Sequence, residues 1–123
     1  MEPSKLVENL KKRVIQSFMD MLVLMELKKH SMSGYDAISL IHRRFGILLS
    51  SGTIYSLLYS LERNGWIKGV WKQRKRVYEL TEKGEQNIEI ITRANSEIQN
   101  FVRNISLLNA NMCAHAVEHV EKK

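Results

Sequence analysis

The sequence contains little cysteine, proline or glycine, and each scarcity excludes a class of protein. One cysteine, Cys113, among 123 residues rules out an intramolecular disulfide framework and is expected of a protein in the reducing cytoplasm. One proline and six glycines are too few for collagen-like or linker-rich chains. Apolar runs stay below the ~18 residues that a membrane span needs, and the opening MEPSKLVENLKKRV lacks the features of a signal peptide. We therefore expect one soluble globular unit with a single core.

Positive charge is concentrated in the first two-thirds of the chain. Residues 1–80 hold 14 Lys or Arg against 7 Asp or Glu, whereas residues 81–123 hold 5 against 6. This asymmetry predicts that the first segment meets a polyanion and that the second meets protein. A mildly basic protein without a polyanionic partner is the plainer alternative.

Apolar residues recur at helical spacing from Ser4 to about Lys29. They lie three or four positions apart, at Leu6, Leu10, Val14, Phe18, Leu22 and Met25. A second helix is expected after Ser33, an N-cap residue that is followed three positions later by Asp36 in a weak form of the capping box. Gly46 suits the position that ends this helix.

A third helix is expected from the N-cap Ser50 to the Asn64-Gly65 pair. On a helical wheel its inner side carries Ile54, Leu57, Leu58 and Leu61. The opposite side carries Gly52, Ser56, Tyr59 and Arg63, with Tyr55 and Ser60 flanking it. This helix is therefore amphipathic, and its outer side bears hydroxyls and aromatic rings with a single basic residue.

Two β-rich runs follow, WIKGVW and VYEL, and KQRKR joins them into an expected hairpin with a basic tip. Trp66 and Trp71 on this hairpin are expected to pack beneath it rather than to form a ligand cage. Three short helices and a hairpin make a winged helix-turn-helix, whose third helix enters the major groove of DNA. We expect this DNA-binding domain to span residues 1–81.

The remaining residues, 82–123, contain no proline and predict one long helix that Thr81 caps. An apolar seam alternates steps of three and four along it, at Ile91, Ala94, Ile98, Phe101, Ile105, Leu108 and Met112. A helix over most of residues 82–120 would be about 55 Å long at ~1.5 Å per residue, too long for this core to cover. We therefore expect a coiled-coil-like dimerisation helix, in a fold that is mainly α with a small β-hairpin.

Three segments resemble the PadR family of winged-helix transcriptional regulators: SGYDAISLI, SSGTIYSLLYSLERNGWI and RKRVYELTEKG. The resemblance implies a homodimer that binds operator DNA through the third helix and the wing, with the C-terminal helix for dimerisation. Repression is the expected mode, although the sequence itself does not distinguish it from activation. Ser51 stands where the family usually has proline, and Tyr59 and Ser60 replace a common basic pair. The charge that neutralises phosphates must therefore come from elsewhere.

The candidate DNA contacts follow from this arrangement, with solvated surface positions as the alternative. Hydroxyls can bond phosphates or base edges, tyrosine rings can touch thymine methyls, and a helix start can donate amides to phosphate. Tyr55 has a second interpretation, packing at the dimer or core boundary. The candidates are Ser50, Ser51, Gly52, Thr53, Tyr55, Ser56, Tyr59 and Arg63 on the third helix, Lys72, Arg74, Lys75 and Arg76 on the wing, and Arg43 on the second helix. Arg44, Lys28 and Lys29 are lesser candidates.

Other functions find less support in the sequence. No glycine-rich phosphate loop, nucleophile elbow or carboxylate pair indicates an enzyme, and no cofactor is expected. Cys113, His115 and His119 form one metal-like cluster, which leaves open a metal- or redox-responsive regulator, but no complete ligand set lies within one chain. An effector pocket is not indicated either, because the long helix offers only Phe101 as an aromatic. A winged-helix adaptor that binds protein instead of DNA is the main alternative.

Overall fold

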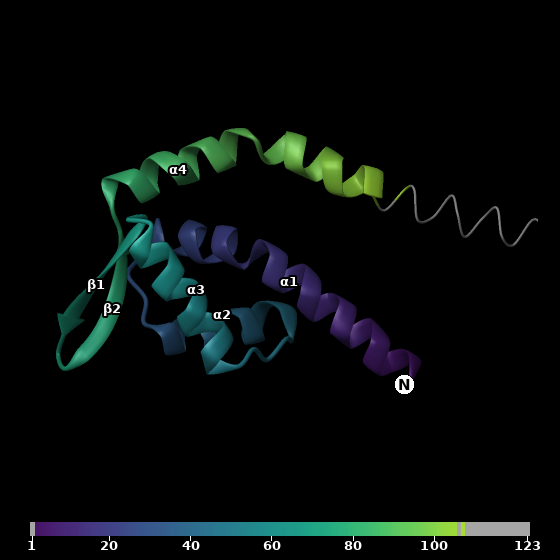
Figure 1. Ribbon diagram of the computed structural model, residues 1–123, viewed down its shortest axis with the longest axis horizontal. Helices are drawn as coiled ribbons and strands as arrows, with labels where there is room; N and C mark the ends of the chain where they lie inside the picture. Colours follow the sequence, from purple (N-terminus) through teal and green to yellow (C-terminus); the bar gives the residue numbers. More distant parts are fainter. Residues whose placement is uncertain (1, 106, 108–123) are drawn as a thin grey trace, which may run out of the picture. The chain divides into compact units, whose positions relative to one another are not determined.

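The computed structural model describes residues 2–105 and 107 (Figure 1). The chain divides into two compact units, Met1–Glu89 and Ile90–Lys123, and each is described by itself. Within residues 2–105 and 107, no helix is long and apolar enough to cross a membrane. The elements follow one another as α1 (Pro3–Leu27), α2 (Gly34–Phe45), α3 (Ser51–Arg63), β1 (Ile67–Lys72), β2 (Lys75–Leu80) and α4 (Glu82–Arg93). The order of three helices, a hairpin and a further helix confirms the predicted winged-helix fold.

The ends of α2 and α3 lie where their cap residues predict. The hydroxyl of Ser33 accepts a hydrogen bond from the Asp36 amide at 3.1 Å, and the Asp36 carboxylate accepts one from the Ser33 amide at 3.0 Å. Both halves of the capping box are therefore present. Gly46 ends α2 with φ 67°, in the left-handed region that favours glycine. Ser50 caps α3 through the Thr53 amide, at 3.2 Å.

The core of the first unit lies where α1, α2, α3 and β1 converge. Its fully buried side chains include Leu24 of α1, Ile41 of α2, Ile54 of α3 and Ile67 of β1. Ile88 of α4 is also fully buried. On the inner side of α3, Ile54, Leu58 and Leu61 are buried as expected, but Leu57 is only partly buried. Leu57 lies at the edge of that side, about 60° from Ile54 on the helical wheel.

The hairpin is longer than the sequence suggested, because KQRKR is not a loop. Strand β1 pairs with β2 from Ile67–Leu80 to Lys72–Lys75, so Lys72, Lys75 and Arg76 lie in the strands. Only Gln73 and Arg74 form the turn, with φ 50° and 65°. Two consecutive positive φ values in a two-residue loop are those of a type I′ turn, whose twist matches that of the strands. The expectation of a long basic tip is corrected to a short turn with cations along both strands.

The expectation that Trp71 packs beneath the hairpin is also wrong. Trp71 is 69% exposed, because it lies next to the distal end of the strands, beyond the helices that form the core. Trp66, which precedes β1, is partly buried as expected. The base of the hairpin is held instead by Met32, which exchanges both backbone hydrogen bonds with Tyr78, at 2.7 and 3.2 Å.

Thr81 joins the hairpin to α4 and confirms its predicted role as a cap. Its hydroxyl donates to the carbonyl of Gly65 at 2.6 Å and accepts from the amide of Gly84 at 3.1 Å. Gly84 faces the backbone so closely that a Cβ there would lie 2.0 Å from the carbonyl oxygen of Trp66. The residues TEKG therefore fix the direction in which α4 leaves the hairpin.

The long C-terminal helix is interrupted. Helix α4 ends at Arg93, Ala94 is a turn residue, and residues 95–105 are helical again. The prediction of one uninterrupted helix is corrected at this point, where Asn95 and Ser96 have side chains that compete for backbone hydrogen bonds. Of the predicted seam, Phe101 and Ile105 are 68% and 57% exposed, and Ile91 and Ile98 are partly exposed. Leu108, Met112, Cys113, His115 and His119 lie outside the described residues.

Candidate nucleic-acid interface

The outer side of α3 is open to solvent along its whole length. Tyr59 is 64% exposed and Tyr55 is 47% exposed. The remaining exposed positions on this helix are Ser51, Gly52, Ser56, Ser60 and Arg63. Arg63 places its guanidinium 5.7 Å from the centre of the Tyr59 ring, a cation–π contact that orders both side chains. Four of the predicted candidates thus share one accessible side, which we call the α3 face (Gly52, Ser56, Tyr59 and Arg63), and Ser51 is exposed at the helix start.

The start of α3 uses two of the predicted residues for its own stability. Ser50 and Thr53 share a hydrogen bond between their hydroxyls, at 2.8 Å, in addition to the cap on the Thr53 amide. A Cβ at Gly52 would meet open space, since nothing lies within 4 Å of the position that it would occupy. The helix start is therefore ordered by Ser50 and kept open by Gly52.

Tyr55 packs against the start of α2, as its second interpretation proposed. A Cβ on Gly34 would lie 2.5 Å from the Tyr55 ring, so only glycine allows this close approach. Gly34 is buried, whereas nearly half of the Tyr55 side chain stays exposed. Tyr55 thus fixes α3 against α2 and still presents one edge beside the α3 face.

The wing carries four of the predicted cations, and three of them have an acidic partner. The Nζ of Lys72 lies 3.0 Å from Glu79, and the Nζ of Lys75 lies 3.7 Å from Asp36 of α2. Arg76 lies 2.8 Å from Glu62 of α3. Arg74, in the turn, has no ion-pair partner within residues 2–105 and 107. The positive charge of the wing is therefore partly compensated within the chain.

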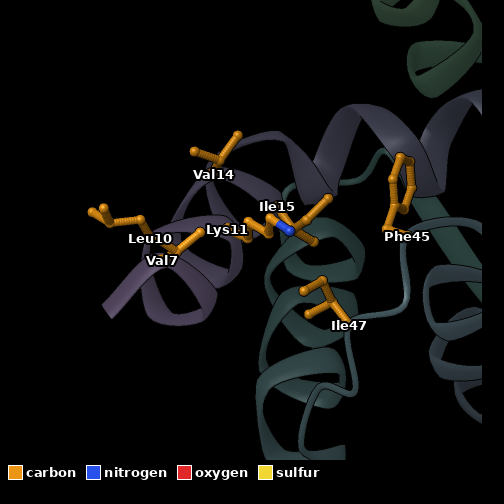
Figure 2. A pocket seen from close by; sticks show the side chains of 7 residues that line it. All are labelled: Val7, Leu10, Lys11, Val14, Ile15, Phe45 and Ile47. Carbon is orange, nitrogen blue, oxygen red and sulfur yellow. The ribbon is translucent and has the colours of Figure 1, made fainter. Parts of the chain in front are cut away.

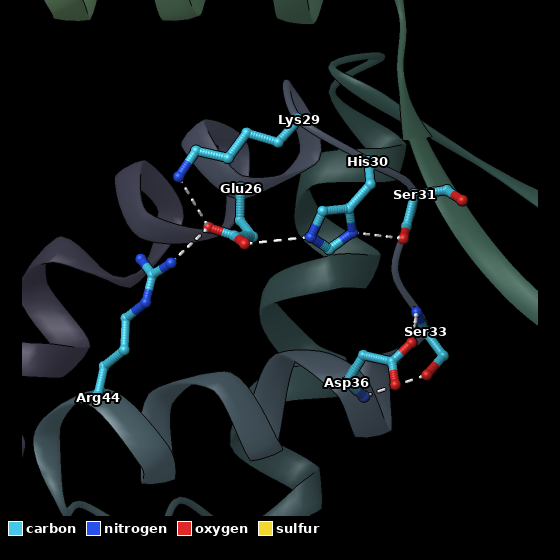
Figure 3. Close-up of polar contacts among 7 residues, drawn as sticks. All are labelled: Glu26, Lys29, His30, Ser31, Ser33, Asp36 and Arg44. Carbon is cyan, nitrogen blue, oxygen red and sulfur yellow. Dashed lines mark hydrogen bonds and ion pairs between the residues drawn. The ribbon is translucent and has the colours of Figure 1, made fainter.

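Two of the lesser candidates, Arg44 and Lys29, are also engaged, around one buried carboxylate (Figure 3), whereas Lys28 is exposed. Glu26 of α1 is 7% exposed and is surrounded by basic side chains from α2 and from the residues that follow α1. Its carboxylate lies 3.2 Å from Arg44 of α2, 3.1 Å from His30 and 3.7 Å from Lys29. These contacts join the end of α1 to the end of α2. Arg43 is exposed beside this cluster and takes no part in these ion pairs.

The cluster around Glu26 shifts two pKa values in opposite directions. Burial raises the pKa of Glu26, but the hydrogen bond from His30 and the charges of Arg44 and Lys29 outweigh it, so the pKa falls below 4.5. The pKa of His30 is raised above 6.5 by hydrogen bonds to the Ser31 carbonyl and to Glu26. The stability from His30 is full below its unfolded pKa and is lost as pH rises through its folded pKa. The stability that Glu26 contributes is present above the unfolded pKa of Glu26 and is lost as pH falls through its folded pKa.

Sequence reasoning missed Glu26 and Glu62 as organisers of this surface. Glu26 had a detectable signal, since it is a lone acid within the apolar run VLMEL, and this run is followed at once by Lys28, Lys29 and His30. Glu62 had none, because its partners, Gly69 and Arg76, lie on two strands whose register only the structure shows. In the part of the chain that the structure describes, no group of three His, Cys, Asp or Glu is placed to hold a metal ion.

A capped, solvent-facing helix beside a two-stranded wing with cations defines a winged helix-turn-helix protein of the DNA-binding class. The sequence matches the model of the "Transcriptional regulator PadR-like family" over residues 23–90, which is more than half of the chain. The chain therefore belongs to the PadR-like family of transcriptional regulators. Among curated proteins, none matches the sequence.

Solved structures share the fold at low sequence identity. A PadR family regulator from Eggerthella lenta is 20% identical with a TM-score of 0.69, over 83% of this chain and 93% of that one. A PadR family regulator from Clostridium difficile is 23% identical with a TM-score of 0.64, over 72% of this chain and 97% of that one. A PadR-like regulator from Bacillus cereus is 19% identical with a TM-score of 0.67, over 76% and 95%. These likenesses confirm the fold.

Proposed function

We propose that this chain is a sequence-specific regulator, most plainly a repressor, that binds operator DNA as a homodimer. Residues 1–81 would bind DNA through α3 and the wing, and residues 82–123 would hold the dimer together. The observation that carries the proposal is the α3 face, where an otherwise well-packed helix leaves its polar and aromatic side exposed. The adaptor function remains the alternative, in which this surface meets protein.

The chemistry of the α3 face suits base edges better than phosphates. Ser56 offers a hydroxyl that can donate to or accept from bases, and Tyr59 adds a ring that can touch a thymine methyl. Gly52 allows the start of α3 to approach the DNA backbone, where the amides of a helix N-terminus favour phosphate. Sequence discrimination would therefore come from this helix.

The wing would supply contacts that do not depend on sequence. Arg74 projects from the turn without an acidic partner among the described residues, so it can meet a phosphate at no electrostatic loss within that part of the protein. Lys72 and Lys75 would exchange their carboxylate partners for phosphates, a small cost because exposed ion pairs contribute only about 0–1 kcal/mol. Arg43 can add one more contact from α2. Arg76 was predicted with this set, but its guanidinium lies 2.8 Å from Glu62.

Apolar surface on both units supports a homodimer. In the second unit, Phe101 and Ile105 of the seam are exposed. In the first unit, the N-terminal half of α1 exposes Leu6, Val7, Leu10 and Val14, each at about half of its surface. A groove of about 390 Å³ lies along this part of α1, and Phe45 and Ile47 complete its lining (Figure 2). Exposed apolar surface of this kind marks a protein interface, and we assign it to a second copy.

A dimer would place two α3 helices in successive major grooves of a near-palindromic site, about 34–36 Å apart if the spacing is one helical turn. The proposed work on DNA and the single cysteine favour the cytoplasm as the place of action. No small-molecule effector is indicated.

Selection of bound sequences from a random DNA pool tests the proposal. We expect a near-palindromic consensus, tight binding of that consensus at moderate salt, and a dimer in sedimentation of the free protein. Absence of DNA binding by the intact chain in a gel-shift titration would contradict the proposed regulator function and favour the protein-binding adaptor. DNA binding without any sequence preference would contradict only one part of the proposal, the reading of bases by the α3 face.

A further inference from the structure

Glu62 joins α3 to the wing through two separate hydrogen bonds. It lies in the last turn of α3, and its Oε2 accepts from the backbone amide of Gly69 in β1 at 2.9 Å. The same oxygen accepts from Nη2 of Arg76 in β2 at 2.8 Å. One carboxylate therefore contacts both strands of the hairpin, and both contacts are hydrogen bonds to a charged acceptor, which are stronger than neutral ones.

The register of the hairpin explains why the Gly69 amide is available. Gly69 lies opposite Tyr78, and Tyr78 uses its own amide and carbonyl on Met32. The Gly69–Tyr78 pair is thus one that exchanges no hydrogen bonds across the ladder, so the Gly69 amide points away from β2. Glu62 satisfies a donor on the outer side of β1 that the sheet itself leaves without a partner.

Arg76 is held in place from three sides. Its guanidinium lies over Gly69, where a Cβ would come within 2.4 Å of Nη2, so only glycine leaves room for it. It also lies 5.6 Å from the centre of the Tyr78 ring, whose side chain is buried. With Glu62 at its end, the side chain is 40% exposed and is directed toward α3. Arg76 therefore differs from Arg74, whose side chain is exposed at the turn.

We propose that Glu62, Gly69 and Arg76 form a clamp that fixes the angle of the wing against α3, and that Arg76 is a positioning residue rather than a phosphate contact. The inference rests on the proposed DNA binding. A wing held at one angle lets both elements reach their sites on DNA at once, whereas a loose wing must be ordered on binding, which weakens affinity. The clamp would matter most for the operator, where both elements must fit together.

The two roles of Arg76 predict opposite effects of one substitution. Glu62→Gln removes a negative charge next to the DNA and releases Arg76. If Arg76 were a phosphate contact restrained by Glu62, this change would tighten binding to every sequence. If the clamp positions the wing, the same change loosens binding to the operator, despite the more favourable charge.

The experiment measures operator and non-operator affinity of the full chain over a range of salt. Glu62→Gln is compared with Glu79→Gln, which removes the same charge but faces Lys72 instead. We expect Glu62→Gln to weaken operator binding by roughly threefold to tenfold and Glu79→Gln to leave it unchanged or tighter. Arg76→Gln should weaken operator binding without changing the salt slope, whereas Arg74→Gln should flatten the slope. Tighter or unchanged operator binding by Glu62→Gln, or a flatter slope for Arg76→Gln, would overturn the proposal.

Two further measurements keep the clamp separate from folding and from the proposed function. Gly69→Ala changes no charge but displaces the guanidinium, and it should weaken operator binding as Glu62→Gln does; operator binding that stays at the wild-type level contradicts the clamp. Amide exchange of Gly69 is read without DNA, and Glu62→Ala should accelerate it relative to the neighbouring strand amides. Unchanged exchange means that no clamp exists, even if the protein binds DNA. A clamp seen by exchange in a protein that binds no DNA means that the proposed function has failed instead.

Discussion

The α3 face and the wing are adjacent but organised on different principles. On the α3 face, Ser56 and Tyr59 supply hydroxyls, Arg63 is the one basic residue, and Ser56 forms no hydrogen bond to a charged side chain within residues 2–105 and 107. On the wing, three of the four predicted cations are paired with carboxylates of the same chain. Basic residues in a sequence are therefore not equivalent to free positive charge. A low content of lysine and arginine accordingly does not exclude a helix as the element that reads bases.

The largest expected effect comes from removing the readout of the α3 face. Ser56→Ala with Tyr59→Ala keeps the fold, because both positions are exposed, but removes the hydroxyl and the ring that would meet bases. We expect discrimination to fall by about 1–3 kcal/mol for each base that is no longer read, with non-operator affinity unchanged. Competition titrations with operator and scrambled DNA measure this. An equal loss of affinity on both DNAs would mean that the α3 face contacts the DNA backbone. It would then not differ in function from the wing.

A smaller and uniform effect is expected from the wing cations. Arg74→Gln with Lys75→Gln should weaken operator and scrambled DNA alike. The log–log salt slope should fall by about 0.9 for each phosphate that the variant no longer neutralises, counted over both copies of a dimer. Binding isotherms at several salt concentrations test it. Lys68→Gln with Lys83→Gln is the matched control, since it removes two cations away from the turn. A control that flattens the slope equally would show that general charge, rather than the cations at the turn, sets the affinity.

The smallest effect is expected at Gly52, where one substitution should change the stability of the free protein and its affinity for DNA in opposite directions. Gly52→Ala should stabilise the free protein by up to about 0.5–1 kcal/mol, because alanine restricts the unfolded chain and meets nothing within 4 Å. The same methyl should weaken DNA binding by holding the helix start away from the backbone. Thermal unfolding and operator titration measure the two changes. If affinity is unchanged while the melting temperature rises, the start of α3 does not approach DNA closely.

Much of the fold could be predicted from local signals. The caps at Ser33, Gly46 and Ser50 act through hydrogen bonds or backbone angles within a few residues of themselves, so the local sequence contains the cause of these helix boundaries. Thr81 also caps α4 through the nearby Gly84 amide, although its hydroxyl bonds to the distant Gly65 carbonyl as well. The exposed side of α3 followed from helical periodicity alone. These features are local, and they were confirmed.

The errors arise where the cause lies outside the local sequence. Gln73 and Arg74 adopt positive φ without the glycine or asparagine that usually signals a type I′ turn, so the hairpin was expected to be shorter. The bond between Glu62 and Arg76 joins residues 14 positions apart and depends on the strand register. Arg76 was accordingly grouped with the free cations by composition. Whether the predicted DNA contacts touch DNA stays a prediction.

The turn at Gln73 and Arg74 has a consequence for engineering. Non-glycine residues in the left-handed region cost on the order of 1–3 kcal/mol each. This turn is therefore less stable than the same turn built from residues that favour positive φ. Gln73→Asn with Arg74→Gly would relieve that strain and raise the melting temperature of the protein. It would also delete the wing cation that has no acidic partner among the described residues. A variant selected only for a higher melting temperature would therefore tend to bind DNA more weakly. Thermostability and DNA affinity would have to be optimised at separate sites.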